Sequence, residues 1–99
     1  MTDETFNADD EAKVNERSKK VTKGRERELD DIKQVLSTKQ GRRHYWKLMC
    51  DCGVFRTSFT GNSTTFFNEG KRAIGLQLLA DLMEADADKY LLMTQEAKD

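Results

Sequence analysis

The sequence has no proline, one histidine, two cysteines and a formal net charge of only −1 over its 99 residues. No apolar run approaches the roughly 18 residues that cross a bilayer, and the first residues, Met-Thr-Asp-Glu, lack the basic-then-apolar order of a signal peptide. A net charge near zero also removes the long-range field of a dedicated nucleic-acid-binding protein and leaves only local basic patches. We therefore expect a cytosolic protein that does not bind a membrane.

The two cysteines give no sign of a disulfide framework or a metal centre. Cys50 and Cys52 stand too close in sequence to join distant segments, and we expect free thiols. On a helix their side chains diverge by about 200°, and only His44 is nearby as a further zinc ligand. A thiol paired with His44 would also lack an orienting partner for nucleophilic catalysis. We therefore expect no enzyme activity, no catalytic residues, no metal ligands and no cofactor.

Apolar residues are concentrated in the second half of the chain. Ten lie in residues 1–40 and 26 in residues 41–99, while 35% of all residues are charged. Residues 1–28 carry acids first and bases next, an order that favours a helix over roughly residues 9–23, but after Met1 their only large apolar side chains are Phe6, Val14 and Val21. We interpret residues 1–28 as a charged arm, partly disordered or helical, that is solvated or becomes ordered on a partner. Residues 29–95 are predicted to form the helical domain.

Helical spacing predicts three or four short helices in this domain, and therefore an all-α bundle. Leu29, Ile32 and Leu36 recur every three or four residues, which indicates a first amphipathic helix. Residues 37–40, Ser-Thr-Lys-Gln, have the form of a capping box in which the Ser37 hydroxyl accepts from the amide three residues on. A second helix should run from here to about Cys52, ended by a left-handed glycine at 53.

The second helix has a predicted core side and a predicted outer side. The core stripe is Tyr45, Leu48, Met49 and Cys52, and the opposite face shows Arg42, Arg43, Trp46, Lys47 and Cys50. Arg42 to Arg72 hold six bases and two acids beside aromatic residues, a composition found in nucleic-acid-binding segments. The candidate nucleic-acid contacts are Arg42, Arg43, Trp46 and Lys47. Because acids crowd the C-terminal part, salt pairing within the fold is the simpler interpretation.

The longest predicted helix runs from about Thr64 to Met83, capped by Asn62 or Ser63. Its apolar stripe is Phe67, Ile74, Leu78 and Leu82, broadened by Leu79 and Met83. Two glycines inside it, Gly70 and Gly75, should let another backbone come close. Asp86 can cap a last short helix of about Ala87–Gln95, which would bury Tyr90, Leu91 and Met93.

A loop between Gly53 and Gly61 brings aromatic residues to the start of the long helix. Four phenylalanines lie within 13 residues, more than a domain this small can easily bury at one end. Exposed aromatic residues ringed by basic ones have the composition of an interface hot spot. The candidate protein-interface residues are Phe55, Arg56, Phe59, Phe66, Lys71 and Arg72. The alternative is that the loop is the lid of the core, and that Lys71, which lies inside the apolar stripe, only extends its ammonium group to solvent.

Several short motifs together resemble one family. They are Gly41-Arg42-Arg43, Cys52-Gly53-Val54-Phe55, Ser58-Phe59, Phe67-Asn68-Glu69-Gly70 with Arg72, Gly75-Leu76 and Tyr90. This pattern, which spans about Leu29 to Met93, resembles a small domain family of mainly short-tailed bacteriophages, encoded among virion-structure genes. The sequence departs from it at Ala73, where asparagine is expected, and at Ala87, where proline often starts the last helix.

The resemblance implies a phage structural or assembly protein, located in the virion or the host cytoplasm, but it carries over no binding or catalytic residue. The expected partners are other phage structural proteins, with self-association as a further alternative. The competing hypothesis is a small phage DNA-associated or regulatory protein that uses the basic stretch 42–72.

Overall fold

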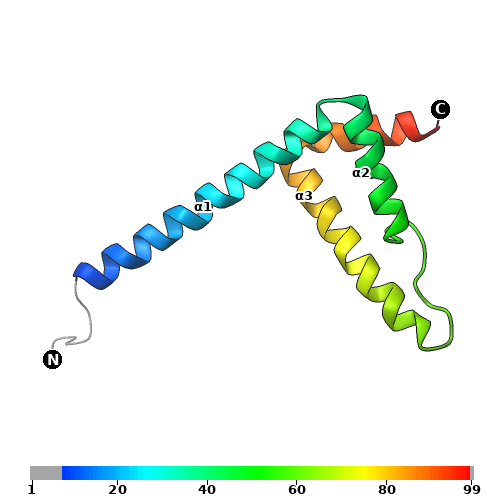
Figure 1. The fold of residues 1–99 in the computed structure, drawn as a ribbon, viewed down its shortest axis with the longest axis horizontal. Helices are drawn as coiled ribbons and strands as arrows, with labels where there is room; N and C mark the ends of the chain where they lie inside the picture. Colours follow the sequence, from blue (N-terminus) through cyan, green and yellow to red (C-terminus); the bar gives the residue numbers. More distant parts are fainter. Residues whose placement is uncertain (1–7, 99) are drawn as a thin grey trace.

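The protein, analysed as a computed structural model that describes residues 8–98, consists of three helices joined by a tight turn and a loop (Figure 1). The helices are α1 (Ala8–Leu36), α2 (Lys39–Asp51) and α3 (Thr64–Lys98), and the described residues contain no strand. The predicted all-α class is therefore confirmed. Within the described range, no helix combines the length and the apolar character needed to cross a membrane.

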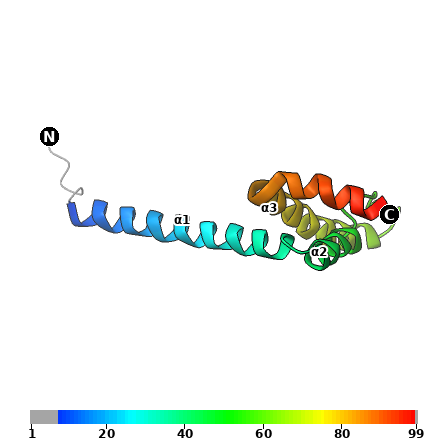
Figure 2. The ribbon, with the colours of Figure 1, turned by 90° about the horizontal axis from the view of Figure 1, so that it is seen from above.

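The arm and the first predicted helix of the domain are one continuous helix, α1. The expectation of two separate helices, over residues 9–23 and 29–36, is wrong because nothing between them interrupts the backbone, and Gly24 is accommodated within the helix. Residues 9–23 are all exposed, and Figure 2 shows α1 extending far beyond α2 and α3. Packing begins near Gly24 and Arg25. The part of the predicted arm before Ala8, including Phe6, lies outside the described residues.

The turn between α1 and α2 is capped one residue later than predicted. Thr38, not Ser37, is the N-cap: its Oγ1 accepts a hydrogen bond of 2.9 Å from the Gly41 amide. The Ser37 hydroxyl instead donates to the Gln34 carbonyl at the end of α1, at 2.6 Å. One hydroxyl therefore bonds a free carbonyl at the end of α1, and the other bonds a free amide at the start of α2. These bonds allow the two helices to meet in a two-residue turn. At the other end of α2, Gly53 adopts the predicted left-handed conformation, with φ 81°.

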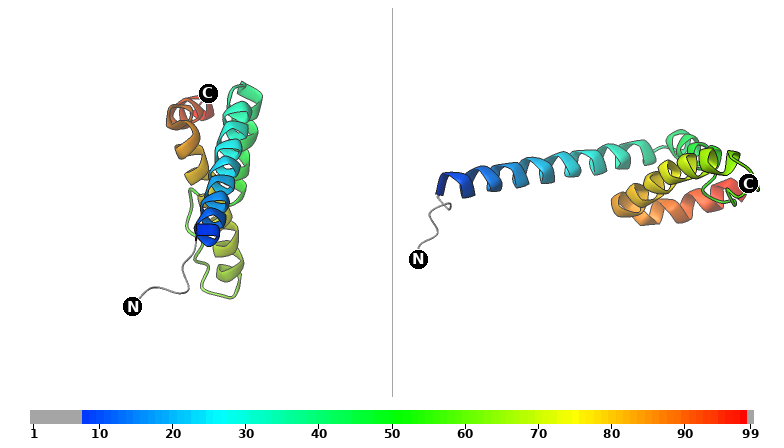
Figure 3. Two further views of the ribbon diagram at one scale, coloured as in Figure 1. Left: turned by 90° about the vertical axis from the view of Figure 1, so that its left-hand side faces the viewer. Right: turned by 90° about the horizontal axis from the view of Figure 1, so that it is seen from below.

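The core lies where all three helices meet. Its buried members are Leu36, Tyr45, Met49, Val54, Leu82 and Met93. The Tyr45 hydroxyl donates to the Leu78 carbonyl, and burial, aided by the negative charge of Asp81, raises the pKa of Tyr45 to about 12. Two predictions for α2 are wrong: Leu48 is exposed, whereas Trp46 packs against the core. The cause is the C-terminal half of α3, which runs beside α2 (Figure 3): its Tyr90 lies against Trp46 and its Glu96 pairs with Arg42, both on the side of α2 that the sequence pattern assigns to solvent.

Helix α3 contains both the third and the fourth predicted helices, separated by a kink. Asp86 leaves the helical conformation with φ −166° and ψ 87°, at the residue where the sequence predicts a new helix to begin. Beyond it the chain turns back toward the start of α2 (Figures 1 and 3). The expected burial of Leu91 is wrong, since its side chain faces solvent, while Met93 is buried as predicted.

The two glycines of the long helix have different surroundings. At Gly75 an added Cβ would lie 2.4 Å from Val54 Cγ2 and 2.6 Å from Cys52 Cβ, so the glycine does permit close approach of the segment after α2. At Gly70 an added Cβ would meet nothing within 4 Å, so the expected close approach within the chain is absent.

Candidate protein-interaction surface

The first turns of α3 and the loop before them carry an unusual concentration of exposed apolar side chains. Phe59, Phe66, Phe67 and Ile74 are 74%, 81%, 67% and 64% exposed, and together we call them the apolar surface. The sequence pattern places Phe67 and Ile74 in the core stripe. That prediction is wrong for two reasons. Phe67 lies in the first turns of α3, which extend past the end of α2 and are covered by no helix among residues 8–98 (Figure 1). Ile74 lies beside the covered face rather than on it, because at this level the chain packs against Gly75. Large exposed apolar patches are typical of interaction sites.

Local hydrogen bonds hold the loop against the beginning of α3. The Asn62 carboxamide oxygen accepts from the Thr64 amide at 2.9 Å, as a predicted capping residue should. The Thr60 amide donates to Thr65 Oγ1 at 2.9 Å, and the Asn68 side chain donates to the Ser58 carbonyl at 3.3 Å. Because both Thr60 and Ser58 are tied to α3, Phe59 between them is held beside the first turns of the helix.

One basic side chain contacts the apolar surface, and two others lie in a nearby depression of the same segment. The ammonium group of Lys71 lies 5.2 Å from the centre of the Phe67 ring, which is a cation–π contact. The aliphatic part of the Lys71 side chain can lie on the apolar surface while its charge stays in water. Arg56 donates to the Cys50 carbonyl at 3.2 Å. Arg56 and Arg72 also line a shallow depression with Phe55 and Glu69. Of the six predicted interface residues, Lys71 therefore contacts the apolar surface, whereas Phe55, Arg56 and Arg72 line the depression.

Phe55 differs from the other loop aromatics because it packs within the chain. Its ring stacks on Trp46 with a centroid distance of 4.9 Å and an interplanar angle of 25°. Trp46 in turn lies 6.4 Å from the ring of Tyr90 on the second half of α3. Phe55 is thus the half-exposed end of a row of rings that begins at the core, whereas Phe59 and Phe66 have no ring partner in the described part of the chain.

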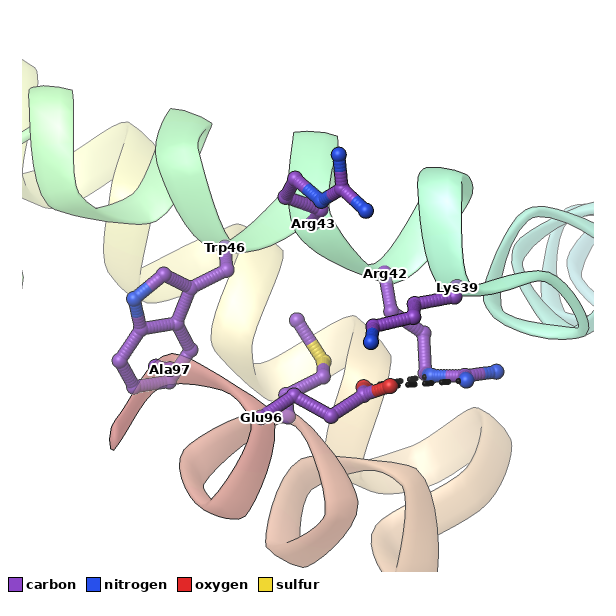
Figure 4. Close-up of a pocket in the computed structure, with 7 residues that line it drawn as sticks. Lys39, Arg42, Arg43, Trp46, Glu96 and Ala97 are labelled. Atoms are coloured by element: carbon purple, nitrogen blue, oxygen red, sulfur yellow. Dashed lines mark hydrogen bonds and ion pairs between the residues drawn. The ribbon is translucent and has the colours of Figure 1, made fainter. Parts of the chain in front are cut away.

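The predicted nucleic-acid residues are mostly engaged inside the fold. Arg42 makes a two-pronged ion pair with Glu96, with Nε–Oε1 2.8 Å and Nη2–Oε2 3.0 Å, and its Nη1 donates to the Leu36 carbonyl at 3.0 Å (Figure 4). Arg42 thereby joins α2 to the ends of α1 and α3. Lys47 pairs with Asp51 one helical turn later. Of the three predicted bases, only Arg43, which points away from Glu96 in Figure 4, is exposed without an ion pair to another described residue.

The crevice beside this ion pair is small. It encloses about 70 Å³ and is lined by Lys39, Arg42, Arg43, Trp46, Met93, Glu96 and Ala97. Sites for small organic ligands are typically about 300–1,000 Å³. Its main feature is electrostatic: hydrogen bonds from the Arg42 guanidinium hold the pKa of Glu96 below its ordinary value.

The Glu96 ion pair predicts a pH dependence of stability. A carboxylate with a depressed pKa stabilises the folded state above its unfolded pKa, about 4.3, and this contribution is lost as the pH falls through the folded value. Glu96→Gln should therefore melt below the wild-type protein at pH 7, and the difference should shrink as the pH falls from about 5 to 3. Thermal melting across this range tests it, with Asp88→Asn as an exposed control. A difference independent of pH would contradict the assigned role.

A second ionic cluster, which the sequence pattern does not indicate, fixes the root of the projecting helix. The Arg25 guanidinium contacts Asp81 at 2.8 Å and Glu84 at 2.7 Å on α3, and Glu28 at 3.0 Å on its own helix. Hydrogen bonds to these carboxylates raise the pKa of Arg25. The partners on α3 lie 56 and 59 residues along the chain, so no local spacing reveals them.

Comparison with known proteins identifies a family. Residues 32–95 match the model of a family described as Bbp19-like phage protein. No curated protein and no solved structure matches the chain significantly.

Proposed function

The chain belongs to the family of Bbp19-like phage proteins, and on this premise we propose that it is a structural or assembly protein of the phage particle that acts by binding other proteins. The observation that carries the proposal is the apolar surface, whose four side chains are each more than three-fifths exposed. A monomeric protein in water gains nothing from such exposure, whereas an interface core gains from burying aromatic side chains.

The surroundings of the apolar surface indicate the character of the partner. Lys71 contacts Phe67 of the apolar surface, and Arg56, Arg72 and the acidic Glu69 line the depression of the same segment, so the charged side chains here are mostly basic. An apolar centre with a charged rim is the usual organisation of a protein interface, and truncation of a central aromatic residue often costs about 2 kcal/mol or more of binding. We expect a protein partner with an apolar patch bordered mainly by carboxylates.

Mass spectrometry of purified virions and of infected-cell lysate tests the proposed role. A structural protein should be enriched in virions relative to lysate, and an assembly protein should be enriched in immature particles. Recovery only as free chain, outside every particle fraction, would contradict the proposal.

A second candidate function, nucleic-acid binding, is favoured by the charge of α1 rather than by the stretch 42–72. Residues 13–27 hold seven bases and two acids, a local excess of five positive charges in a chain of net charge −1. Among them Lys13, Arg17, Lys20 and Arg27 recur at helical spacing on one face, and the first three lie in the wholly exposed segment 9–23. A projecting basic helix of this kind can contact successive phosphates.

Salt dependence distinguishes this candidate. If α1 binds DNA, changing Lys13, Arg17 and Lys20 to glutamine should flatten the slope of log affinity against log salt by about 2–3 units. The control carries the same loss of charge at Lys33, Lys39 and Lys98, which are exposed outside the basic segment 13–27, and should flatten it little. Wild-type binding weaker than about 10⁻⁴ M at physiological salt would contradict the candidate.

A further inference from the structure

The segment between α2 and α3 is held against α3 at two points. At its start, an added Cβ on Gly75 would lie 2.4 Å from Val54 Cγ2 and 2.6 Å from Cys52 Cβ, so the chain touches the helix there. Further along, the Ser58 carbonyl accepts a hydrogen bond of 3.3 Å from the Asn68 side chain. Asn68 and Gly75 are about two helical turns apart on one face of α3.

Between these two contacts the segment and α3 form a cavity of about 190 Å³, which we call the loop cavity. Lys71 lies one turn after Asn68 and one turn before Gly75, which places it between the two contacts. Sites for small organic ligands are typically about 300–1,000 Å³, so the loop cavity has room for one polar group rather than for a whole metabolite. Its lining includes the polar side chains of Arg56, Thr57, Ser58, Asn68 and Lys71.

The loop cavity is positively charged. Of its described lining residues, Arg56 and Lys71 are bases and none is an acid. Neither base has an ion pair with another residue in the range 8–98. Lys71 is half-buried, and its contact with the Phe67 ring does not neutralise its charge. Because two like charges share a small space, an anion bound in the loop cavity would stabilise both.

Neutral side chains add hydrogen-bond donors to the same space. The Ser58 hydroxyl makes no hydrogen bond with another described residue, and Asn68 uses only one N–H of its side chain for the Ser58 carbonyl. Arg56 uses one N–H of its guanidinium for the Cys50 carbonyl and keeps the others. Donors from a guanidinium, an ammonium, a hydroxyl and an amide group are typical of a site for an oxyanion, to which charged donors make the strongest hydrogen bonds.

We propose that the loop cavity binds a carboxylate of the protein partner while the apolar surface contacts apolar side chains of the same partner. The proposal deepens the proposed function and rests on it, since it assigns a binding site to one acidic group of the partner. Its support is the charge of the loop cavity, its donors and its position.

The loop cavity adjoins the apolar surface. Lys71 belongs to both places, because its ammonium group lies 5.2 Å from the centre of the Phe67 ring while its side chain lines the loop cavity. Two further pairs of consecutive residues also join them, Ser58 with Phe59 and Phe67 with Asn68. A protein that covers the apolar surface therefore brings its neighbouring residues close to the loop cavity.

A carboxylate from a protein fits this position better than a phosphate of a nucleic acid. A nucleic-acid backbone is a row of phosphates, which proteins bind with many bases, whereas the loop cavity holds two. The bases that favour a nucleic acid lie on α1, which projects away from α2 and α3 (Figure 2).

The neighbouring carboxylate of Asp51 already responds to the charge of the loop cavity. A hydrogen bond from Lys47 is the main cause that lowers the pKa of Asp51, and the positive charges of Lys47, Arg56 and Lys71 add to it. Asp51 itself is exposed and paired with Lys47, and it does not line the loop cavity. A carboxylate inside the loop cavity would lie directly beside Arg56 and Lys71.

Amide NMR spectra of the full chain, recorded at constant ionic strength during titration with an acidic probe, test the proposal. The probe is tetraglutamate with blocked ends, and blocked tetraglutamine is its uncharged counterpart. Tetraglutamate should cause saturable shifts of the Gly53, Ser58 and Asn68 amide signals, with a dissociation constant on the order of millimolar because the rest of the interface is missing. Tetraglutamine should cause none.

Charge variants identify the residues that bind the probe. Lys71→Gln and Arg56→Gln, taken singly, should each raise the dissociation constant about tenfold or more, because each removes a charge-assisted hydrogen bond. Lys71→Arg keeps the charge and should bind within a few-fold of wild type. The matched control is Lys89→Gln, which removes the same charge from another half-buried lysine of α3 that does not line the loop cavity, and it should bind like wild type.

Inorganic phosphate, titrated in the same way, distinguishes the two kinds of oxyanion. Phosphate that binds no more tightly than tetraglutamate supports a carboxylate ligand. Phosphate that shifts the same amide signals and binds more tightly would overturn the assignment to a carboxylate and favour a phosphate ligand.

The absence of saturable shifts with tetraglutamate up to about 10 mM would also overturn the proposal, and so would equal losses of affinity for Lys71→Gln and Lys89→Gln. These results are separate from the test of the proposed function. A chain that is enriched in virions but does not bind the probe would refute only the carboxylate site. Probe binding by a chain found outside every particle fraction would refute only the proposed function.

Discussion

Replacing Gly41 by alanine should destabilise the protein by about 3 kcal/mol or more. A Cβ at this position would lie 1.8 Å from the Val35 carbonyl oxygen and 2.9 Å from the Val35 carbonyl carbon. Both are backbone atoms, which cannot rotate away as the end of a side chain can. Relief therefore requires the end of α1 to move relative to α2, which disturbs the packing of Leu36 in the core.

Urea unfolding measures this effect, and a second glycine supplies the control. Gly70→Ala makes the same chemical change in α3, where nothing lies within 4 Å, and should be neutral or stabilising by up to about 1 kcal/mol. The comparison is made at low concentration, so that association of copies does not contribute. Equal stability of Gly41→Ala and the wild-type protein would show that the α1–α2 turn is less close than described.

Leu82→Ala should cost about 2–5 kcal/mol, a large share of the stability of a small domain. Leu82 is fully buried, and its side chain packs among residues from all three helices, so truncation leaves a cavity that the surrounding side chains fill only in part. The matched control is Leu91→Ala, on the second half of α3. Leu91 is 63% exposed, and its truncation should change the free energy of unfolding by less than about 0.5 kcal/mol. Similar losses for both variants would contradict the described core.

Helical periodicity predicts which parts of the domain are helical, but not the burial of their side chains. The stripes at residues 29–36 and 74–82, the left-handed Gly53 and the break at Asp86 all follow from local spacing or local backbone preference. The exposure of Phe67 and Ile74 does not, because a stripe shows neither how far the neighbouring chain reaches along the helix nor how much of the width of the stripe it covers. The length of α1 is not predicted for a related reason. The charged residues 9–23 have no apolar periodicity, but they continue the helix formed by residues 24–36, which pack against the rest of the domain.

Of the two candidate sites, the sequence predicts the apolar surface but not the state of the basic patch. The dense run of phenylalanines in the sequence predicts an apolar surface at the start of α3, and Phe59 and Phe66 are indeed exposed. The composition of residues 42–47 suggests a basic patch, but Arg42 is occupied by Glu96, 54 residues further along the chain. The Arg42–Glu96 ion pair depends on the kink at Asp86, which brings the end of α3 back to α2. No local sequence motif indicates that these two residues pair.

The most direct test of the central claim, that the apolar surface binds a protein partner in the phage particle, is one measurement on Phe59→Ala made in parallel with Leu91→Ala. Both positions are exposed, but only Phe59 belongs to the apolar surface. The account predicts that both variants melt within a few degrees of the wild-type protein, and that only Phe59→Ala is missing from assembled particles. A Phe59→Ala variant that loses about 3–5 kcal/mol of stability, as a core residue would, or that enters particles at the wild-type level, would contradict it.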